Sequence, residues 1–325
     1  DIILSSAALR AIRNKFGKNY KITALVSEEN KDLLLRCPYI DELLVCNFKG
    51  KDRGLRGLWN LSSLLRKKCF DIVIDLQNNR KSHILAFLSG SCRRYGYNNN
   101  KLGRLLNYGI VDNKEKISPL KHQFKILNRL GIELVDDSLE MWVAPEDQKY
   151  IDDFLGSEWL SAKQKLVGIN ISSSIRWESK SYPQTHLLRL CQELSKLDIR
   201  VVLTGSKHDC VSADELVKKL GPVKVINACG KTTINQLACL IGRCSVYISA
   251  DSAPLHIASS QKVPFVALFG PTDSSRHLPP AQEGKFILIK KELPCAPCYK
   301  PKCNTKKCME MIAPQEVLEA VKKLI

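Results

Sequence analysis

The sequence predicts an α/β protein made of two successive Rossmann-like, doubly wound domains that face a central cleft. Two observations support this class. Short apolar runs alternate with segments of helical periodicity along the 325 residues, and strands that are separated by helices pair in parallel. Polar residues directly follow several apolar runs, and open α/β sheets bind ligands at the carboxyl ends of their strands. A chain of this length accommodates two ordinary domains, which we expect at residues 1–160 and 161–325.

The first domain alternates helices with strands. The expected helices cover residues 2–16, 29–35, 57–67, 81–88 and 122–130. The expected strands cover residues 20–26, 42–46 and 70–76, with a short edge strand at 94–97. A domain of this class begins with a strand, so we expect the printed sequence to lack roughly ten residues, about one strand and its turn. Charged helical residues at 144–160 lead into the connection between the domains.

The second domain repeats this alternation. Its expected strands cover residues 166–171, 200–204, 223–227, 246–248, 263–269 and 286–290. Its expected helices cover residues 186–197, 210–220, 234–243, 257–261 and 314–325. We expect the last of these helices to pack back on the first domain.

The segment 246–273 carries the most specific pattern. An apolar strand is followed by a polar turn that starts at Asp251 and Ser252, then by His256 in the next helix. The strand after that helix ends in Gly-Pro-Thr. Helix N-termini at strand ends bind anions, so we predict that this segment holds a nucleotide-sugar. The alternative is a helix cap with a core histidine, but a cap alone requires neither His256 nor the Gly-Pro-Thr turn.

A second polar loop follows the first strand of the second domain. It contains Ser173, Ser174 and Lys180. Small hydroxyl side chains let the backbone approach a ligand and donate hydrogen bonds, while lysine supplies positive charge. This chemistry suits a diphosphate; the alternative is a polar surface loop. Thr204-Gly205 ends the next strand and indicates a position near the nucleotide, although this pattern alone is weak evidence.

The chain is strongly basic, with 50 lysines and arginines against 33 acidic residues and a net charge of +17. A basic excess favours anionic partners, namely nucleic acid, anionic lipid or phosphorylated substrates. For any single cluster of basic residues, a solvated surface is the simpler interpretation. Aromatic content is 7% and no nucleic-acid-binding motif is present, so we expect no nucleic-acid partner. No stretch approaches the ~20 apolar residues of a membrane span.

The chain has 13 cysteines, most of them scattered through apolar runs. Buried reduced cysteine behaves as a small hydrophobe, which indicates a reducing compartment. The remaining four, Cys295, Cys298, Cys303 and Cys308, lie close together in one loop. They are suited to bind Zn²⁺ or an iron–sulfur cluster, or to form two disulfides. In a reducing compartment a structural metal is favoured over disulfides.

Two of these stretches, DSAPLH and the LFGPTD that follows it, resemble glycosyltransferase family 9, the lipopolysaccharide heptosyltransferases. The family carries D-[ST]-[GA]-x-x-H in its second domain, followed by a strand and a [FY]-G-[PS]-[TS] turn. Other stretches match along nearly the whole chain. The resemblance implies the GT-B architecture and sugar transfer with inversion at the anomeric carbon. It also implies that no cofactor is required for catalysis.

The resemblance also implies roles for single residues. Asp1 matches the family's general base, although a helix-capping aspartate is the alternative. The stretch DLQNNRKS at 75–82 resembles D-x-Q-G-x-x-[KR]-[ST] and makes Gln77, Arg80 and Lys81 acceptor-binding residues, with helix capping as the alternative. Asn78 replaces the usual glycine and tolerates the left-handed conformation better than most residues.

The donor-binding set that the resemblance implies lies wholly in the second domain. It consists of Ser173, Ser174, Lys180, Thr204, Gly205, Asp251, Ser252, Ala253 and His256. No D-x-D motif stands near this set, so the charge of the leaving group is expected to be stabilised by Lys180, hydroxyls and the helix dipole rather than by Mg²⁺.

These observations predict an inverting glycosyltransferase that moves a heptose from ADP-heptose to an anionic lipopolysaccharide inner-core acceptor of the Kdo-lipid A type. We expect a cytoplasmic protein at the inner face of the cytoplasmic membrane, in peripheral contact with its anionic surface, because the first domain is basic. The alternatives are a glycosyltransferase with another nucleotide-sugar and glycan acceptor, or a non-catalytic nucleotide- or polyanion-binding protein.

Overall fold

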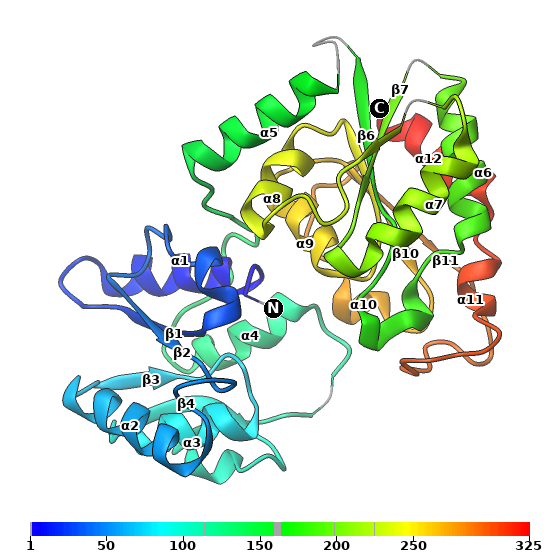
Figure 1. Cartoon of the computed structure of the whole chain (residues 1–325). Coiled ribbons are helices and arrows are strands. Elements are labelled where there is room, and N and C mark those ends of the chain that lie inside the picture. Colours follow the sequence, from blue (N-terminus) through cyan, green and yellow to red (C-terminus); the bar gives the residue numbers. More distant parts are fainter. Residues whose placement is uncertain (1, 114, 159–163, 198, 224) are drawn as a thin grey trace. The chain divides into compact units, whose positions relative to one another are not determined.

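The computed structural model describes residues 2–113, 115–158, 164–197, 199–223 and 225–325 (Figure 1). The chain forms two compact units, Ile2–Asp137 and Ser138–Ile325. This division falls earlier than residue 160, because helix α5 (Pro145–Ser157) packs on helix α8 (Ile234–Gly242) of the second unit. Each described helix is too short or too polar to cross a membrane.

The first unit contains parallel strands in two sheets. Strand β1 (Thr23–Ser27) pairs with β2 (Glu42–Cys46), and a second sheet has the order β3 (Ile72–Ile74), β4 (Arg93–Asn98), β5 (Tyr108–Val111). The expectation of an edge strand at 94–97 is wrong, because β4 pairs with β3 on one side and with β5 on the other. Strand β5 was not predicted from the sequence, because it is four residues long and none of its residues is fully buried.

The helices of the first unit lie close to the expected ranges. They are α1 (Ser5–Phe16), α2 (Gly54–Lys67), α3 (Arg80–Leu88) and α4 (Pro119–Asn128), with the short 3₁₀ helices η1 (Glu28–Leu33) and η2 (Gly103–Leu105). Helix α4 follows Ser118, whose side chain accepts a hydrogen bond from the N–H of Lys121, and begins with a proline. Both features favour helix initiation.

The second unit is built on one parallel sheet of six strands in the order β11-β10-β9-β6-β7-β8. The strands are β6 (Lys165–Asn170), β7 (Ile199–Thr204), β8 (Val225–Asn227), β9 (Val246–Ala250), β10 (Phe265–Phe269) and β11 (Phe286–Lys290). The chain extends the sheet first from β6 toward β8 and then, in the opposite direction, from β9 toward β11. The topological switch point, where such sheets bind ligands, therefore lies between β6 and β9.

Helices cover both faces of this sheet (Figure 1). The main ones are α6 (Gln184–Ser195), α7 (Cys210–Leu220), α9 (Ala253–Ser260) and α12 (Pro314–Leu324), in addition to α5 and α8. Shorter elements are η3 (Ile175–Lys180), η4 (Lys207–Asp209), α10 (Ser274–His277) and α11 (Lys307–Glu310), none of which the sequence analysis expected. Helix α9 begins four residues before the expected start, at the alanine that follows Ser252.

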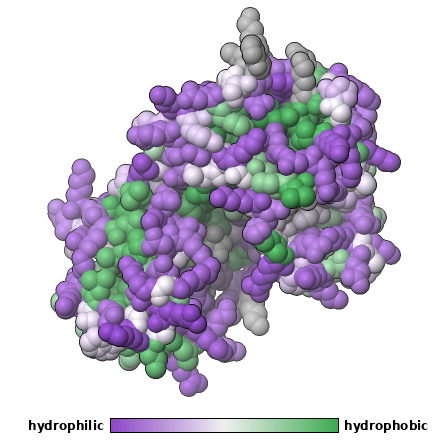
Figure 2. Space-filling view, in the orientation of Figure 1, coloured by the Kyte–Doolittle hydropathy of each residue, from purple (hydrophilic) through white to green (hydrophobic). Residues whose placement is uncertain are grey.

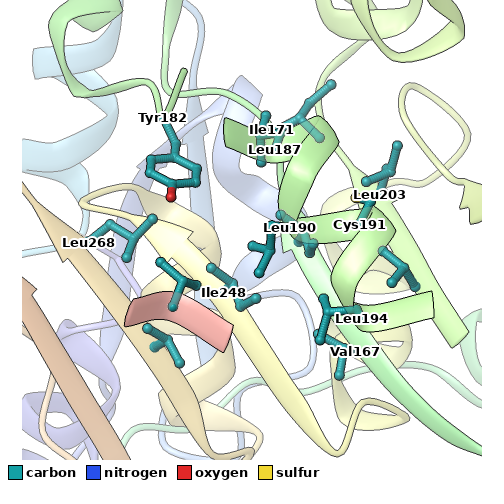
Figure 3. Packing of buried hydrophobic residues seen from close by; sticks show 14 of the residues in the cluster. Val167, Ile171, Tyr182, Leu187, Leu190, Cys191, Leu194, Leu203, Ile248 and Leu268 are labelled. Atoms are coloured by element: carbon teal, nitrogen blue, oxygen red, sulfur yellow. The ribbon is translucent and has the colours of Figure 1, made fainter. Parts of the chain in front are cut away.

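The core of the second unit lies between the sheet and helices α6, α7 and α12. Alternate residues of β6 and β9, such as Val167 and Ile248, point into it and meet Leu187 and Leu190 of α6 (Figure 3). Helix α12 was expected to pack on the first domain. Its apolar face instead packs on α6, β10 and β11, because its buried side chains belong to this core.

Close packing also joins β6 to β9 at the switch point. Gly168 pairs with Tyr247, and a Cβ atom added at Gly168 would lie 2.4 Å from the tyrosine ring. Only glycine leaves room for that ring. Hydrophilic residues cover most of the face that Figure 2 shows.

Candidate functional site

The site at the switch point is organised by Asn170, the last residue of β6. Its side-chain amide donates to the backbone carbonyl of Ser172 at 2.5 Å. The same amide lies 3.1 Å from the hydroxyl of Ser252 and 3.3 Å from that of Ser249. One buried amide thus joins the loop after β6 to the turn after β9, and it fixes the two predicted donor loops next to each other.

A buried ion pair lies at the centre of the site. The Lys180 ammonium is 2.7 Å from Oδ2 of Asp251, and the Thr272 hydroxyl donates to the same oxygen at 2.7 Å. The two charged side chains are only 13% and 7% exposed. The Lys180 ammonium also lies 4.5 Å from the centroid of the Trp177 ring, in cation–π geometry. Three segments distant in the sequence therefore converge on one carboxylate oxygen.

The short helix η3 brings Lys180 to this position. Ser173, which precedes η3, donates from its hydroxyl to the carbonyl of Trp177 inside the helix. The hydroxyls of Ser173 and Ser181 are 3.1 Å apart, so the two ends of the loop are joined. Ser174 is exposed at the start of η3 and forms no side-chain capping bond. Of the two predicted serines, Ser173 thus shapes the loop and Ser174 faces solvent.

The start of helix α9 is less open to an anion than the sequence suggests. Ser252 turns its hydroxyl toward the carbonyl of Ala250 instead of capping the helix. Pro254 has no N–H, and the N–H of Leu255 already donates to the carbonyl of Ser252 at 3.0 Å. The exposed Ala253 occupies the first helical position. Most of the positive charge at this site therefore comes from Lys180.

His256 lies one turn further along α9. Burial lowers the pKa of this histidine to about 4, with further lowering from His277 and Lys180 and an opposing effect from Asp251. The imidazole is therefore neutral at pH 7. Its Nδ1 atom is buried and has no hydrogen-bond partner in the described part of the chain. Burial also lowers the pKa of His277, which shares Lys180 and Asp251 as neighbours.

Thr204 and Gly205 occupy the end of β7. The Thr204 side chain is 1% exposed, and its hydroxyl is 2.5 Å from the hydroxyl of Tyr247 and 3.3 Å from the carbonyl of Ile169. The Thr204 hydroxyl therefore points into the core, and the assignment of Thr204 to the donor-binding set stays a prediction. Gly205 accepts a backbone hydrogen bond from Gly230 and lies close to Asp209.

In the first unit, Asp75 organises the turn between β3 and α3. One of its carboxylate oxygens accepts from the N–H groups of Gln77 and Asn78 at 2.9 and 3.0 Å. Its other oxygen lies 3.3 Å from Nε2 of the fully buried His83, whose Nδ1 is 2.8 Å from the carbonyl of Lys101. Asn78 has a φ of +54°, the left-handed conformation that an asparagine tolerates.

Helix α3 is capped by Asn79 and Ser82, and not by the side chains of the predicted acceptor-binding residues. Asn79 accepts from the N–H groups of Lys81 and Ser82, and the hydroxyl of Ser82 accepts from the N–H of Asn79. Gln77, Arg80 and Lys81 are exposed around this turn. The Lys81 ammonium lies 4.8 Å from the centroid of the Phe48 ring.

Two predicted features stay untested. Asp1 lies outside the described residues. Cys295, Cys298, Cys303 and Cys308 are free thiols. Across the described ranges, no group of three or more histidine, cysteine or acidic side chains is arranged to hold a metal ion.

Three contributors to the site, Asn170, Trp177 and Thr272, are absent from the predicted donor-binding set, although the Gly-Pro-Thr turn that contains Thr272 was singled out in the sequence. Asn170 is the last residue of β6 and Thr272 lies three residues beyond the end of β10, so both stand at the carboxyl ends of apolar strands, and that rule was available from the sequence. The position of Trp177 depends on the turn of η3, which the irregular loop sequence does not indicate.

Comparisons with known proteins identify the family and the fold of the chain. The profile of glycosyltransferase family 9 (heptosyltransferase) matches residues 58–309. The chain is 26% identical to lipooligosaccharide heptosyltransferase 2 of Campylobacter jejuni, over all of this chain and 95% of the relative. The crystal structure of a family 9 glycosyltransferase from Veillonella parvula is 25% identical, with a TM-score of 0.88 over 99% of this chain and 93% of that one.

A third comparison concerns the ADP-heptose lps heptosyltransferase II of Escherichia coli. Its structure matches all of this chain and 95% of its own with a TM-score of 0.79 at 22% identity. At that identity the likeness shows the fold alone, and the fold is the one predicted from the alternation of strands and helices.

Proposed function

Because the chain belongs to glycosyltransferase family 9, it is a glycosyltransferase, and we propose that it transfers a heptose from ADP-heptose to an inner-core acceptor of lipopolysaccharide or lipooligosaccharide. The names of the Campylobacter and Escherichia proteins support this donor and this acceptor class. The proposal includes inversion at the anomeric carbon.

The ion pair of Lys180 with Asp251 is the observation that carries the donor assignment. It places a nearly buried positive charge at the switch point of the sheet. A pre-oriented charge in a poorly solvated site stabilises the negative charge that develops on a diphosphate leaving group. Asp251 holds the ammonium in place before the donor binds, and Thr272 donates to the same carboxylate oxygen, so little reorganisation is needed. The proposal requires no cofactor at this step.

The acceptor is proposed to bind at the turn before α3, where Gln77, Arg80 and Lys81 are exposed. Asp1 is proposed to remove the proton from the acceptor hydroxyl. The hydroxyl oxygen then forms a bond to the anomeric carbon while the bond from that carbon to the diphosphate oxygen breaks, and ADP leaves with the electron pair. An anionic acceptor agrees with the net charge of +17.

We further propose that the protein binds peripherally to the anionic inner face of the cytoplasmic membrane, where a lipid-linked acceptor is found. Helix α2 supports this location. It exposes Leu55 and Trp59, which are 87% and 71% exposed, beside the exposed basic residues Lys51, Arg53 and Arg56. Exposed apolar side chains combined with basic ones are typical of surfaces that bind anionic membranes.

Calorimetric titration of the protein with ADP, GDP, UDP and CDP tests the donor assignment. Selective binding of ADP is the expected result, followed by transfer from ADP-heptose to a Kdo-lipid A acceptor. Preference for another nucleoside diphosphate would keep the glycosyltransferase activity and change the donor sugar. Absence of binding to all four would contradict the donor site.

A further inference from the structure

Three consecutive residues in the loop between β11 and α11 contact both sides of the Lys180 site. We propose that this tripeptide, Tyr299-Lys300-Pro301, is a positioning element that holds Lys180 and Thr272 at the spacing needed for a donor diphosphate. We refer to residues 299–301 as the strap. The diphosphate in this proposal rests on the proposed function, whereas the positioning itself is visible without any ligand.

The strap contacts the lysine side of the site through Ser179. The N–H of Ser179 donates to the carbonyl of Pro301 at 3.1 Å, and its hydroxyl donates to the carbonyl of Lys300 at 2.6 Å. Ser179 is 1% exposed and directly precedes Lys180. Two hydrogen bonds on one buried residue fix the direction in which the next side chain leaves the backbone.

The strap contacts the opposite side through Tyr299. The N–H of Tyr299 donates to the carbonyl of Pro271 at 2.8 Å, and its hydroxyl lies 3.4 Å from the N–H of Asp273. These two partners flank Thr272. The Tyr299 ring also packs at a tilt against that of His277, with centroids 5.9 Å apart.

Tyr299 adopts a conformation that bulky residues rarely take. Its φ is +52°, in the left-handed region, which a bulky side chain adopts only where the surroundings hold it there. This turn aims the N–H of Tyr299 at one segment while the next two carbonyls face Ser179. This backbone conformation therefore lets three consecutive residues contact both the segment before Lys180 and the segment around Thr272.

The segment that follows the strap is anchored in the hydrophobic core, and this anchoring restricts the movement of the strap. Met309 and Ile312 are fully buried. A Cβ atom added at Gly270 would lie 2.5 Å from the sulfur of Met309, which shows how closely α11 approaches the end of β10. The hydroxyl of Tyr182 donates to the carbonyl of Ile312 at 3.0 Å.

Together these contacts form a closed ring. On its inner side, Lys180 and Thr272 meet at Asp251. On its outer side, the strap joins the residue before Lys180 to the residues on either side of Thr272. Loss of a contact between the strap and either segment would let Lys180 and Thr272 move apart. The affinity for a diphosphate would then fall, although no side chain that contacts the diphosphate has been removed.

The variant Ser179→Ala tests the lysine side. We expect it to weaken ADP binding by about 3- to 10-fold, the equivalent of one lost hydrogen bond. The KM for the donor should rise in parallel, while kcat at saturating donor changes less. Ser195→Ala is the matched control, because Ser195 also donates to a backbone carbonyl, that of Gln192, but lies exposed at the end of α6.

A double-mutant cycle separates positioning from general loosening. If Ser179 acts through Lys180, Ser179→Ala should weaken ADP binding little further in a Lys180→Ala background. Equal effects of Ser179→Ala in both backgrounds would overturn the proposal, as would an unchanged ADP affinity in the single variant.

Hydrogen exchange of the unliganded protein provides a readout that does not depend on the proposed function. In Tyr299→Ala we expect faster exchange in both segments 176–182 and 270–273, and a smaller increase confined to 270–273 in Tyr299→Phe, which keeps the ring but loses the hydroxyl that accepts from Asp273. Faster exchange around residue 299 alone would overturn the strap. A wild-type protein that binds no nucleotide but shows this coupled exchange would contradict the proposed function and support the strap.

Discussion

Lys180 and Asp251 are the pair of side chains on which the site depends most. Both are nearly buried and carry opposite charges 2.7 Å apart. Removing one member of such a pair leaves an uncompensated buried charge, which is strongly destabilising. Changes at Lys180 therefore affect stability as well as binding, and the two effects have to be measured separately.

We predict that Lys180→Ala weakens ADP binding by about 10- to 100-fold, the range expected for a lost charge-assisted hydrogen bond. It should also lower Tm, because Asp251 loses its partner. The variant Lys180→Ala/Asp251→Asn should recover much of the lost Tm but not the affinity, as measured by calorimetry and thermal unfolding. An unchanged ADP affinity in Lys180→Ala would refute this placement of the lysine.

His256 makes stability depend on pH. Its pKa is about 4 in the folded protein and about 6.5 in an unfolded chain. Between these values the unfolded chain binds a proton that the folded protein does not bind. The free energy of unfolding is therefore fully retained above pH 6.5 and falls as the pH decreases toward 4. His277 contributes in the same direction, because its pKa is also lowered.

Urea unfolding at pH 7, 5.5 and 4.5 measures this dependence. In His256→Gln we expect a smaller loss of unfolding free energy on acidification than in the wild type. His208→Gln, in the exposed η4 turn, is the control and should follow the wild type. If His256→Gln shows the wild-type slope, the buried neutral imidazole is not the cause.

Among the elements, helix α2 has an unusual distribution of apolar residues. It buries Leu61 and Leu65 against its own unit, yet it exposes Leu55 and Trp59 one turn apart. Exposed single apolar residues are common, but two of them beside basic residues form a surface suited to a lipid interface.

We predict that Leu55→Ser/Trp59→Ser lowers binding to vesicles that contain anionic lipid by about 10-fold, because two apolar anchors are lost. Cosedimentation with vesicles measures this. The control is Val211→Ser, which removes a 70% exposed apolar side chain from α7 of the second unit. Equal binding by the double variant and the wild type would exclude α2 as the contact surface.

Helices and strands with a strong apolar periodicity were predictable from the sequence. Elements that depend on hydrogen bonds to distant segments were not. The buried strands β9 and β10 and the helix α7 stand within two residues of their expected starts, because their apolar patterns are dense. The short helix η3 was expected to be a loop. Hydrogen bonds, rather than an apolar face, define it: Ser173 donates to a carbonyl of η3, and Ser179 of η3 donates to a carbonyl of the strap. Four cysteines bracket the strap, and the predicted metal or disulfide there stays a prediction.

At the scale of the whole molecule, the described donor groups lie within a single compact unit. Lys180, Asp251 and Thr272, together with the strap, all belong to Ser138–Ile325. The core of this unit is continuous from β6 to α12. We therefore expect donor recognition to be separable from the first unit, which carries the proposed acceptor residues.

We predict that residues 138–325, produced alone, fold and bind ADP within about 10-fold of the affinity of the whole chain. Circular dichroism and calorimetry check the two parts of this statement. Lys180→Ala in the same segment should abolish most of the binding. A folded segment without ADP affinity would place part of the nucleotide site in the first unit.

The sequence by itself determined the family, the parallel α/β class and the loops in which donor residues are proposed, because strand ends and their motifs are local patterns. Only the tertiary structure decided that Lys180 pairs with Asp251, 71 positions away, and that Thr272 shares the same oxygen. It also turned Thr204 into the core and brought the strap to both sides of the site. The physical reason is that these contacts depend on β6 lying beside β9, which the sheet as a whole dictates and no single segment encodes.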